Sequence, residues 1–166
     1  LEDQAKAFGA ECEQIMLSVI QPDRERKGNM RLSGIGKPLR QQYNTFNGIP
    51  GEDLEGATYI KFLYGHLIEA MVVSLARMAG HTVEDQQKEV HCAGVKGHID
   101  GRIDGVLVDI KSASNKAFKK FSQSKLHEDD AFGYIGQLKA YAHAEEDDEY
   151  GWVAMDKTTG QLAVLI

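Results

Sequence analysis

The sequence predicts an α/β domain in which a mixed central β-sheet is flanked by helices. Three observations support this fold class. An apolar segment with helical periodicity occupies 58–79, and three strand-like segments follow it. Two further helical segments and a terminal hairpin complete the order. A chain of 166 residues is long enough for these elements to share one core.

The individual elements follow from periodicity and from glycine and proline positions. A helix is expected at 1–20, and a loop with a short helix at 21–51. The helix at 58–79 is apolar nearly all round, so it should be buried, and Gly80 should cap it. Further elements are strands at 88–92, 95–103 and 106–112, helices at 116–124 and 134–144, and a hairpin of 152–155 with 161–166 turning at 157–160. We expect one domain, 1–166, made of an N-terminal helix and basic loop region (1–52) and a core (53–166).

Composition excludes several classes of protein. No apolar run is expected to cross a membrane, and no secretory signal pattern opens the sequence. The two cysteines, Cys12 and Cys92, form neither a CxxC site nor a disulfide framework, which favours a reducing cytoplasm. The net charge of −6 argues against nucleic-acid binding by overall charge alone. It is compatible with acidic metal ligands beside a local basic patch.

The sequence GHIDGRIDGVLVDIKS predicts a hairpin that turns at Asp104 and the glycine after it. Asp before Gly is explained by turn geometry, so Asp104 is not expected to be a ligand. In this register Asp100 faces Asp109, and His98 faces Lys111. Alternate residues share a face of a strand, so Asp100, Asp109 and Lys111 lie on one face, and Ile110 on the other with the core.

Two carboxylates placed opposite one another repel unless a cation lies between them or one takes a proton. Mg²⁺ commonly takes one or two carboxylates together with water and substrate phosphate. Lys111 would reach the same site as a positive charge, where it could orient or acidify a water molecule. From the hairpin alone, a metal site and a surface ion pair involving Lys111 are both open.

Four motifs in order, between 58 and 141, resemble the PD-(D/E)xK nuclease superfamily. The aspartates and Asp-Ile-Lys of the hairpin resemble its central motif, and GHID resembles the GxxD strand of RecB-type nucleases. Gly65 and Glu69, in YGHLIE, resemble the glycine–glutamate pair of phage lambda-type exonucleases. Gln137 and Tyr141, in GQLKAY, resemble the QxxxY motif. The fold implied is a restriction-endonuclease-like core, with the catalytic residues within 53–166.

The resemblance implies a catalytic set. Its members are Glu69, Asp100, Asp109, Lys111, Gln137 and Tyr141. Glu69, Asp100, Asp109 and the Ile110 carbonyl would hold Mg²⁺ or Mn²⁺, with His66 as a candidate further contact. Without the resemblance, Glu69 would be read as a helix-surface acid paired with Arg77 or His66. Two cysteines cannot hold the iron–sulfur cluster that some relatives carry.

Residues expected to contact DNA come from two sources. Ser33 and Arg40, in RLSGIGKPLR, resemble an N-terminal Ser-to-Arg segment of the same group, and Gln137 and Tyr141 enter with their motif. Charge and spacing add residues after the catalytic strand, where lysines interleave with aromatic residues, although a solvated face is the alternative. These residues are Ser112, Lys116, Lys119, Lys120 and Lys125.

The function expected is a metal-dependent DNA exonuclease that leaves 5′-phosphates. The resemblance places it in recombination, repair or phage DNA metabolism, in the cytoplasm of a bacterium or a phage-infected host. DNA is the expected partner, a second copy or a recombination protein is a candidate partner, and no membrane is expected. The alternatives are a restriction-type or structure-specific endonuclease, and a nucleic-acid-binding module with a vestigial active site.

Overall fold

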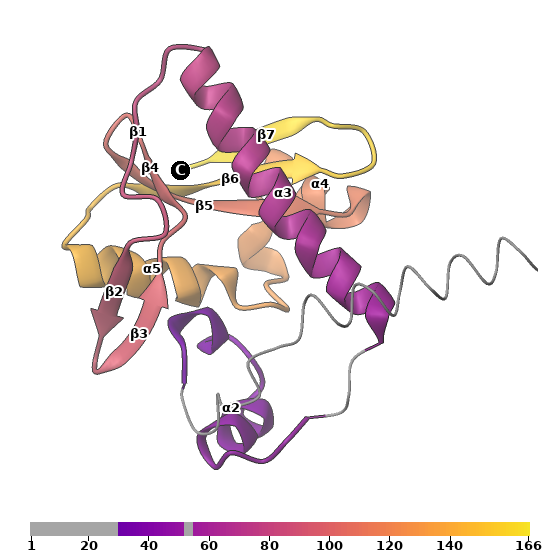
Figure 1. Ribbon diagram of the computed structural model, residues 1–166, viewed down its shortest axis with the longest axis vertical. Helices are drawn as coiled ribbons and strands as arrows, with labels where there is room; N and C mark the ends of the chain where they lie inside the picture. The colour runs from indigo at the N-terminus through magenta and orange to yellow at the C-terminus, as the bar shows by residue number, and fades with distance from the viewer. Residues whose placement is uncertain (1–29, 52–54) are drawn as a thin grey trace, which may run out of the picture.

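The structure is a computed structural model that describes residues 30–51 and 55–166. The helix predicted for 1–20 lies outside the described residues. A five-stranded sheet of order β1–β4–β5–β6–β7 forms the centre (Figure 1). Its strands are β1 (Val83–Glu84), β4 (Gly101–Ile103), β5 (Val106–Ala113), β6 (Tyr150–Asp156) and β7 (Leu162–Leu165). β5 and β6 are parallel and the other neighbours antiparallel, which confirms the predicted mixed sheet.

Helices cover both faces of the sheet. On one face α3 (Gly56–Met78) packs Ile68 and Val72 against Val108 and Ile110 of β5. The other face carries α4 (Asn115–Ser122) and α5 (Tyr134–Glu145), whose apolar residues pack around Leu107. The helices predicted at 58–79, 116–124 and 134–144 and the terminal hairpin are confirmed. The short 3₁₀ helix η2 (Leu126–Glu128) connects α4 to the loop before α5.

The basic segment contains the predicted short helix, α2 (Leu39–Phe46), which follows the 3₁₀ helix η1 (Leu32–Gly34). Leu32 is fully buried in the same core as α5 and so attaches this segment to the domain. Gly36 also attaches the segment to the domain by packing against Gly133. The contact is so close that a Cβ atom on Gly36 would lie 2.1 Å from the Gly133 Cα.

The predicted strand at 95–103 is two strands. β3 (Val95–His98) pairs with β2 (Glu89–Cys92) in a separate hairpin, and β4 begins at Gly101. Gly101 has a φ of 153°, and a Cβ atom there would lie 3.0 Å from the Glu84 carbonyl oxygen. The expectation that His98 faces Lys111 is therefore wrong. The β4–β5 ladder starts only at Gly101, and His98 belongs to β3, where it pairs with Glu89.

The prediction that α3 is buried is wrong for much of its surface. Ile68, Val72 and Val73 are buried, whereas Phe62 and Leu67 are more than half exposed and Met78 is 84% exposed, within the part of the chain described. α3 also has the length and composition of a membrane span, with a hydropathy of 1.3, contrary to expectation. Its buried stripe nevertheless packs on the sheet, and the absence of a membrane partner stays a prediction.

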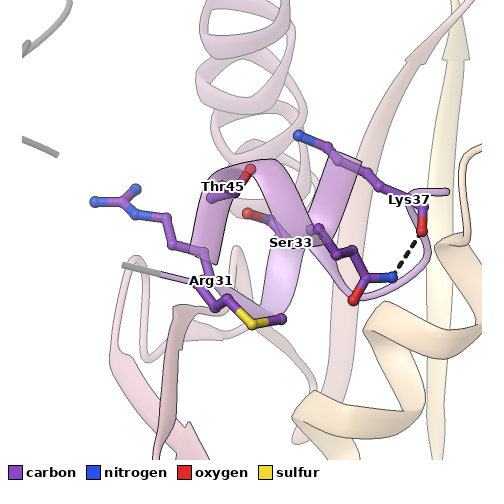
Figure 2. A pocket seen from close by; sticks show the side chains of 7 residues that line it. Arg31, Ser33, Lys37 and Thr45 are labelled. Carbon is purple, nitrogen blue, oxygen red and sulfur yellow. Dashed lines mark hydrogen bonds between the residues drawn. The ribbon is translucent and has the colours of Figure 1, made fainter. Parts of the chain in front are cut away.

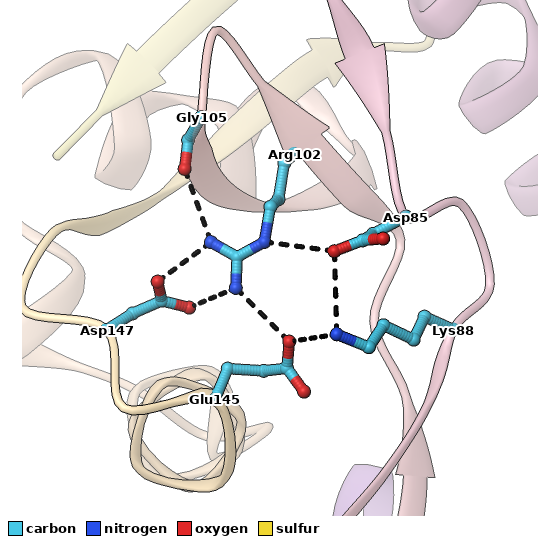
Figure 3. A network of polar contacts seen from close by, with 6 residues as sticks. All are labelled: Asp85, Lys88, Arg102, Gly105, Glu145 and Asp147. Atoms are coloured by element: carbon cyan, nitrogen blue, oxygen red, sulfur yellow. Dashed lines mark hydrogen bonds and ion pairs between the residues drawn. The ribbon is translucent and has the colours of Figure 1, made fainter.

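A network of charged side chains holds β4 to the end of α5 (Figure 3). The Arg102 guanidinium donates two hydrogen bonds of 2.7 Å to the Asp147 carboxylate and lies 3.2 Å from both Glu145 and Asp85. Lys88 joins it through Glu145 at 2.6 Å. Bidentate Arg–carboxylate pairs are among the stronger polar contacts, so this network fixes the position of the strand that begins immediately after Asp100.

Candidate active site

β5 brings Asp109 and Lys111 together as its alternation predicts. Both side chains lie on the α5 side of the sheet, opposite Val108 and Ile110. The Lys111 ammonium lies 2.7 Å from Asp109 Oδ2, and Asp109 is only 2% exposed. The lysine therefore forms an ion pair, as one alternative predicted, but its partner is a buried aspartate of the same strand and the pair does not lie on the surface.

Asp100 reaches the site by a different route from the one predicted. The β4–β5 ladder ends at Gly101 and Val108, so Asp100 and Asp109 are not paired residues of that ladder. Instead, Asp100 Oδ2 accepts a 2.6 Å hydrogen bond from the backbone N–H of Ile110. Asp100, Asp109 and Lys111 still converge, because Ile110 lies between the other two in the chain.

Burial raises the pKa of both aspartates, and charge repulsion adds to the shift. Burial raises the pKa of Asp100, and the Asp109 charge raises it further, to about 7, despite the opposing effects of Lys111 and the Ile110 N–H. Burial raises the pKa of Asp109 as well, with a smaller contribution from Glu69, while Lys111 opposes it. Burial alone would lower the pKa of Lys111, but the aspartates outweigh it and raise the pKa, so the ammonium stays charged.

α5 supplies the other side chains around the Lys111 ammonium. Gln137 Oε1 lies 3.5 Å from Lys111 Nζ, and Gln137 Nε2 donates to the Tyr141 hydroxyl at 3.1 Å. These two residues are one helical turn apart and share a face, as predicted. Tyr134 adds its ring, whose centroid lies 4.8 Å from Lys111 Nζ. Of the predicted QxxxY motif, Gln137 thus contacts the lysine and Tyr141 contacts Gln137.

Glu69 lies at the border of this site. Its charge raises the pKa of both aspartates, and its Oε1 accepts a 2.6 Å hydrogen bond from Gln87. The alternative pairing with Arg77 is wrong, since Arg77 contacts Gln86 and the Val83 carbonyl. His66 is exposed on the same helix, and its role as a metal contact stays a prediction.

The two motif glycines differ in their surroundings. A Cβ atom on Gly97 would lie 2.6 Å from Tyr141 Cε1 and 2.9 Å from Leu32 Cβ, so the glycine of GHID makes room for the tyrosine. A Cβ atom on Gly65 would meet no described atom within 4 Å. Packing thus accounts for Gly97, whereas nothing in the described structure accounts for Gly65.

The chemistry of the site fits a divalent cation held by two carboxylates. Within 30–51 and 55–166, no three His, Cys, Asp or Glu side chains form a metal-binding group. Half-buried Asp100 and buried Asp109 nevertheless lie close enough for the Asp109 charge to act on Asp100, and the Lys111 ammonium contacts Asp109 Oδ2 at 2.7 Å. One or two carboxylates are the usual protein contribution to a Mg²⁺ site, so the pair suffices.

The lysines predicted to contact DNA have different surroundings. Lys116 and Lys119 are exposed on α4, and Lys125 is exposed beyond its end. Lys120 is already paired with Asp129 at 2.6 Å. The aromatic residues that interleave with these lysines, Phe118 and Phe121, are buried in the core, so they cannot stack on bases. Ser112 follows Lys111 on β5, and strand alternation places it on the opposite, α3 side of the sheet.

Ser33 lines a pocket of about 210 Å³ beside α2. Figure 2 shows Arg31, Lys37 and Thr45 around it, and Gln42 closes one side by donating a 2.6 Å hydrogen bond to the Lys37 carbonyl. Among the described residues, the lining includes two cations and two hydroxyl groups and contains no carboxylate. Arg40 does not line this pocket and is exposed on α2.

Sequence reasoning missed Tyr134 and Gln87. Tyr134 begins α5 three residues before Gln137, a spacing that places both on one face of a helix and could have revealed it. Gln87 lies in an irregular segment after β1, and no pattern in the sequence connects it to Glu69.

Comparisons with known proteins support the fold. No protein-family model matches the sequence, and neither does any curated protein. The solved structures that resemble it include SSO0001 and an alkaline exonuclease. SSO0001 has a TM-score of 0.51 and 13% identity over 95% of this chain and 76% of that one. The chain thus has a fold similar to that of the alkaline exonuclease from Laribacter hongkongensis, with a TM-score of 0.57 and 16% identity over 84% of this chain and 77% of that chain.

Proposed function

We propose that this protein is a metal-dependent DNA exonuclease that hydrolyses phosphodiester bonds to 5′-phosphate products. The observation that carries the proposal is the convergence of Asp100, Asp109 and Lys111 in one largely buried site. The solved alkaline exonuclease of similar fold supports the same class of substrate. A role in recombination, repair or phage DNA metabolism is part of the proposal.

Asp100 and Asp109, with the Ile110 carbonyl and Glu69, would hold Mg²⁺ or Mn²⁺. A bound divalent ion would supply charge stabilisation at the phosphate and acidify a water molecule. Two carboxylates with raised pKa values, one half-buried and one buried, would ionise when such a cation arrives, which makes the pair a receptive site.

Lys111 would act on the attacking water and on the charge that develops at phosphorus. Its ammonium stays protonated beside Asp109, so it serves as a positive charge and hydrogen-bond donor rather than as a base. Gln137 accepts from Lys111 and is itself held by Tyr141, so these two would orient the ammonium as well as contact DNA.

DNA backbone would pass the basic surfaces beside the site. The pocket lined by Ser33, Arg31 and Lys37 contains cations and a hydroxyl suited to a phosphate group. Lys116, Lys119 and Arg40 are exposed and able to approach a second stretch of backbone. Such contacts bind DNA without regard to sequence, as an exonuclease requires.

The decisive experiment is digestion of end-labelled linear duplex and single-stranded DNA beside covalently closed circular DNA, with Mg²⁺ or Mn²⁺. Progressive loss of linear DNA to products with 5′-phosphates, no cleavage of circles, and loss of activity in Asp109→Ala would support the proposal. Internal cutting of circles would indicate an endonuclease. Metal-independent DNA binding without any cleavage would indicate a vestigial binding module.

A further inference from the structure

An exposed aromatic ring stands beside the candidate active site. Phe132 lies in the loop between η2 and α5 and is 67% exposed. Its ring stacks on that of Tyr134, with centroids 5.5 Å apart and planes 21° apart. Phe132 thus leaves most of its own ring in solvent.

Tyr134 connects this exposed ring both to the site and to the core. The centroid of its ring lies 4.8 Å from the Lys111 ammonium nitrogen. Its ring also packs near that of buried Phe121, with centroids 6.0 Å apart, and the Phe121 ring packs near that of Trp152, with centroids 6.4 Å apart. Phe132 is the outer end of this aromatic series, anchored through Tyr134 to the residue proposed to act on the phosphate.

The loop that carries Phe132 is held by several contacts. The Asp130 carboxylate accepts hydrogen bonds of 2.8 and 2.9 Å from the backbone N–H groups of Tyr134 and Ile135. Gly133, with a φ of 71°, packs so closely on Gly36 that a Cβ atom would lie 2.0 Å from the Gly36 Cα. A ring supported in this way needs little ordering when a ligand stacks on it.

Two aspartates precede the ring in the same loop, and both already have hydrogen-bond donors. Asp129 forms a 2.6 Å ion pair with Lys120, and Asp130 caps the amides that open α5. Phe132 therefore offers a nucleic-acid strand an apolar ring beside two aspartates whose carboxylates already have donors. An aromatic face offers stacking to any base, whatever the sequence.

We propose that Phe132, supported by Tyr134, is a stacking platform for an unpaired nucleobase next to the bond positioned at Lys111. This inference rests on the proposed function and specifies its substrate class, namely DNA that is single-stranded or frayed at the site. Phe132 is a positioning residue, because it would hold the base while Lys111 and the aspartates act on the phosphate.

The test measures binding without metal, so that no DNA is cleaved. Single-stranded oligonucleotides carrying 2-aminopurine at successive positions are titrated with the wild type, Phe132→Ala, Phe132→Leu and Phe132→Trp, all in EDTA. In the wild type, fluorescence should be quenched at one or two positions. Phe132→Ala should lose that quenching and bind about tenfold more weakly, as expected for the loss of one stacked base.

Two controls separate stacking from general damage. Phe132→Trp should retain quenching and affinity, whereas Phe132→Leu, which keeps apolar bulk without an aromatic face, should not. An oligonucleotide with an abasic site at the quenched position should bind the wild type and Phe132→Ala equally. Melting temperatures of all variants should match that of the wild type, since the ring is mostly exposed.

The inference is overturned if Phe132→Ala binds and quenches like the wild type while the wild type still cleaves DNA with Mg²⁺. That result would leave the proposed exonuclease intact. If the wild type neither binds nor cleaves any DNA, the proposed function fails and the platform fails with it.

Discussion

The carboxylate of Asp100 accepts a 2.6 Å hydrogen bond from the backbone N–H of Ile110, across the end of the β4–β5 hairpin. Ile110 lies between Asp109 and Lys111, so this bond ties Asp100 to the short segment that holds the other two polar residues. A backbone donor has a fixed position in the sheet, and it therefore places the Asp100 carboxylate more firmly than a mobile side-chain partner would.

The raised pKa of Asp100 predicts a pH-dependent stability in the metal-free protein. Because this pKa is about 7 in the folded state and 3.8 for an ordinary aspartate, the folded protein binds the extra proton between these values. The contribution of Asp100 to stability is therefore complete below pH 3.8 and is lost as the pH rises to about 7.

Denaturant unfolding in EDTA checks this prediction. The difference in unfolding free energy between wild type and Asp100→Asn should change by up to about 1.4 kcal/mol per pH unit across that interval. The amide that replaces the carboxyl group in this variant cannot ionise, so the variant should gain relative stability as the pH rises. A difference that does not vary with pH would show that Asp100 is ionised throughout.

Divalent metal should stabilise the wild type by binding the folded state alone. Mn²⁺ titrated against the wild type should raise the melting temperature progressively, because the ion offsets the repulsion between Asp100 and Asp109. Asp109→Ala should show a much smaller response. Equal responses from the two proteins would exclude the site, and Asp104→Ala serves as a control because Asp104 contacts His81 and Thr82 instead.

Lys111→Ala should reduce turnover by about two orders of magnitude or more, the scale seen when one electrostatic stabiliser is lost. The same variant should unfold more easily in EDTA, because buried Asp109 loses its cation. Steady-state kinetics with linear DNA and thermal unfolding measure the two effects. Lys61→Ala, which removes an exposed lysine of α3 outside the proposed site, is the matched control, and near-normal turnover in Lys111→Ala would refute the assigned role.

The two motif glycines should respond oppositely to alanine. Gly97→Ala should destabilise the protein and disturb Tyr141, since its methyl group would meet the tyrosine ring and Leu32. Gly65→Ala should be neutral or stabilising by up to about 1 kcal/mol, because helical alanine is favoured and space is open. Unfolding and cleavage assays together check this. Stable Gly65→Ala with lost cleavage would assign Gly65 to substrate contact, whereas equal destabilisation of both variants would contradict the packing described.

The exposed lysines of α4 should contribute to DNA affinity through counterion release. Replacing Lys116 and Lys119 together by Ala should weaken binding and reduce the slope of log K against log salt by about 0.9 for each lost duplex phosphate contact. Lys120→Ala should have a smaller effect, because Lys120 is already paired with Asp129. Lys61→Ala, on α3, is a control for total charge. An unchanged slope in the double variant would mean that these lysines are only solvated.

Local pattern in the sequence was sufficient for the β5 strand and its turn. Alternation places Asp109 and Lys111 on one face, and the Asp104 turn has the positive φ of 51° that such a hairpin requires. The helical spacing of Gln137 and Tyr141 also predicted their shared face. These features depend on residues close in the chain, so periodicity and turn chemistry determine them.

The tertiary structure decided the rest. The break at Gly101 takes His98 out of register and brings Asp100 to the Ile110 N–H, because Gly101 passes close to the Glu84 carbonyl of a strand absent from the prediction. Hydrophobic content predicted that α3 prefers burial, but which of its faces is covered depends on where the sheet lies. The partner of Glu69 and the stacking of Phe132 on Tyr134 likewise arise from chain segments brought together by packing, and such encounters have no local pattern from which they could be read.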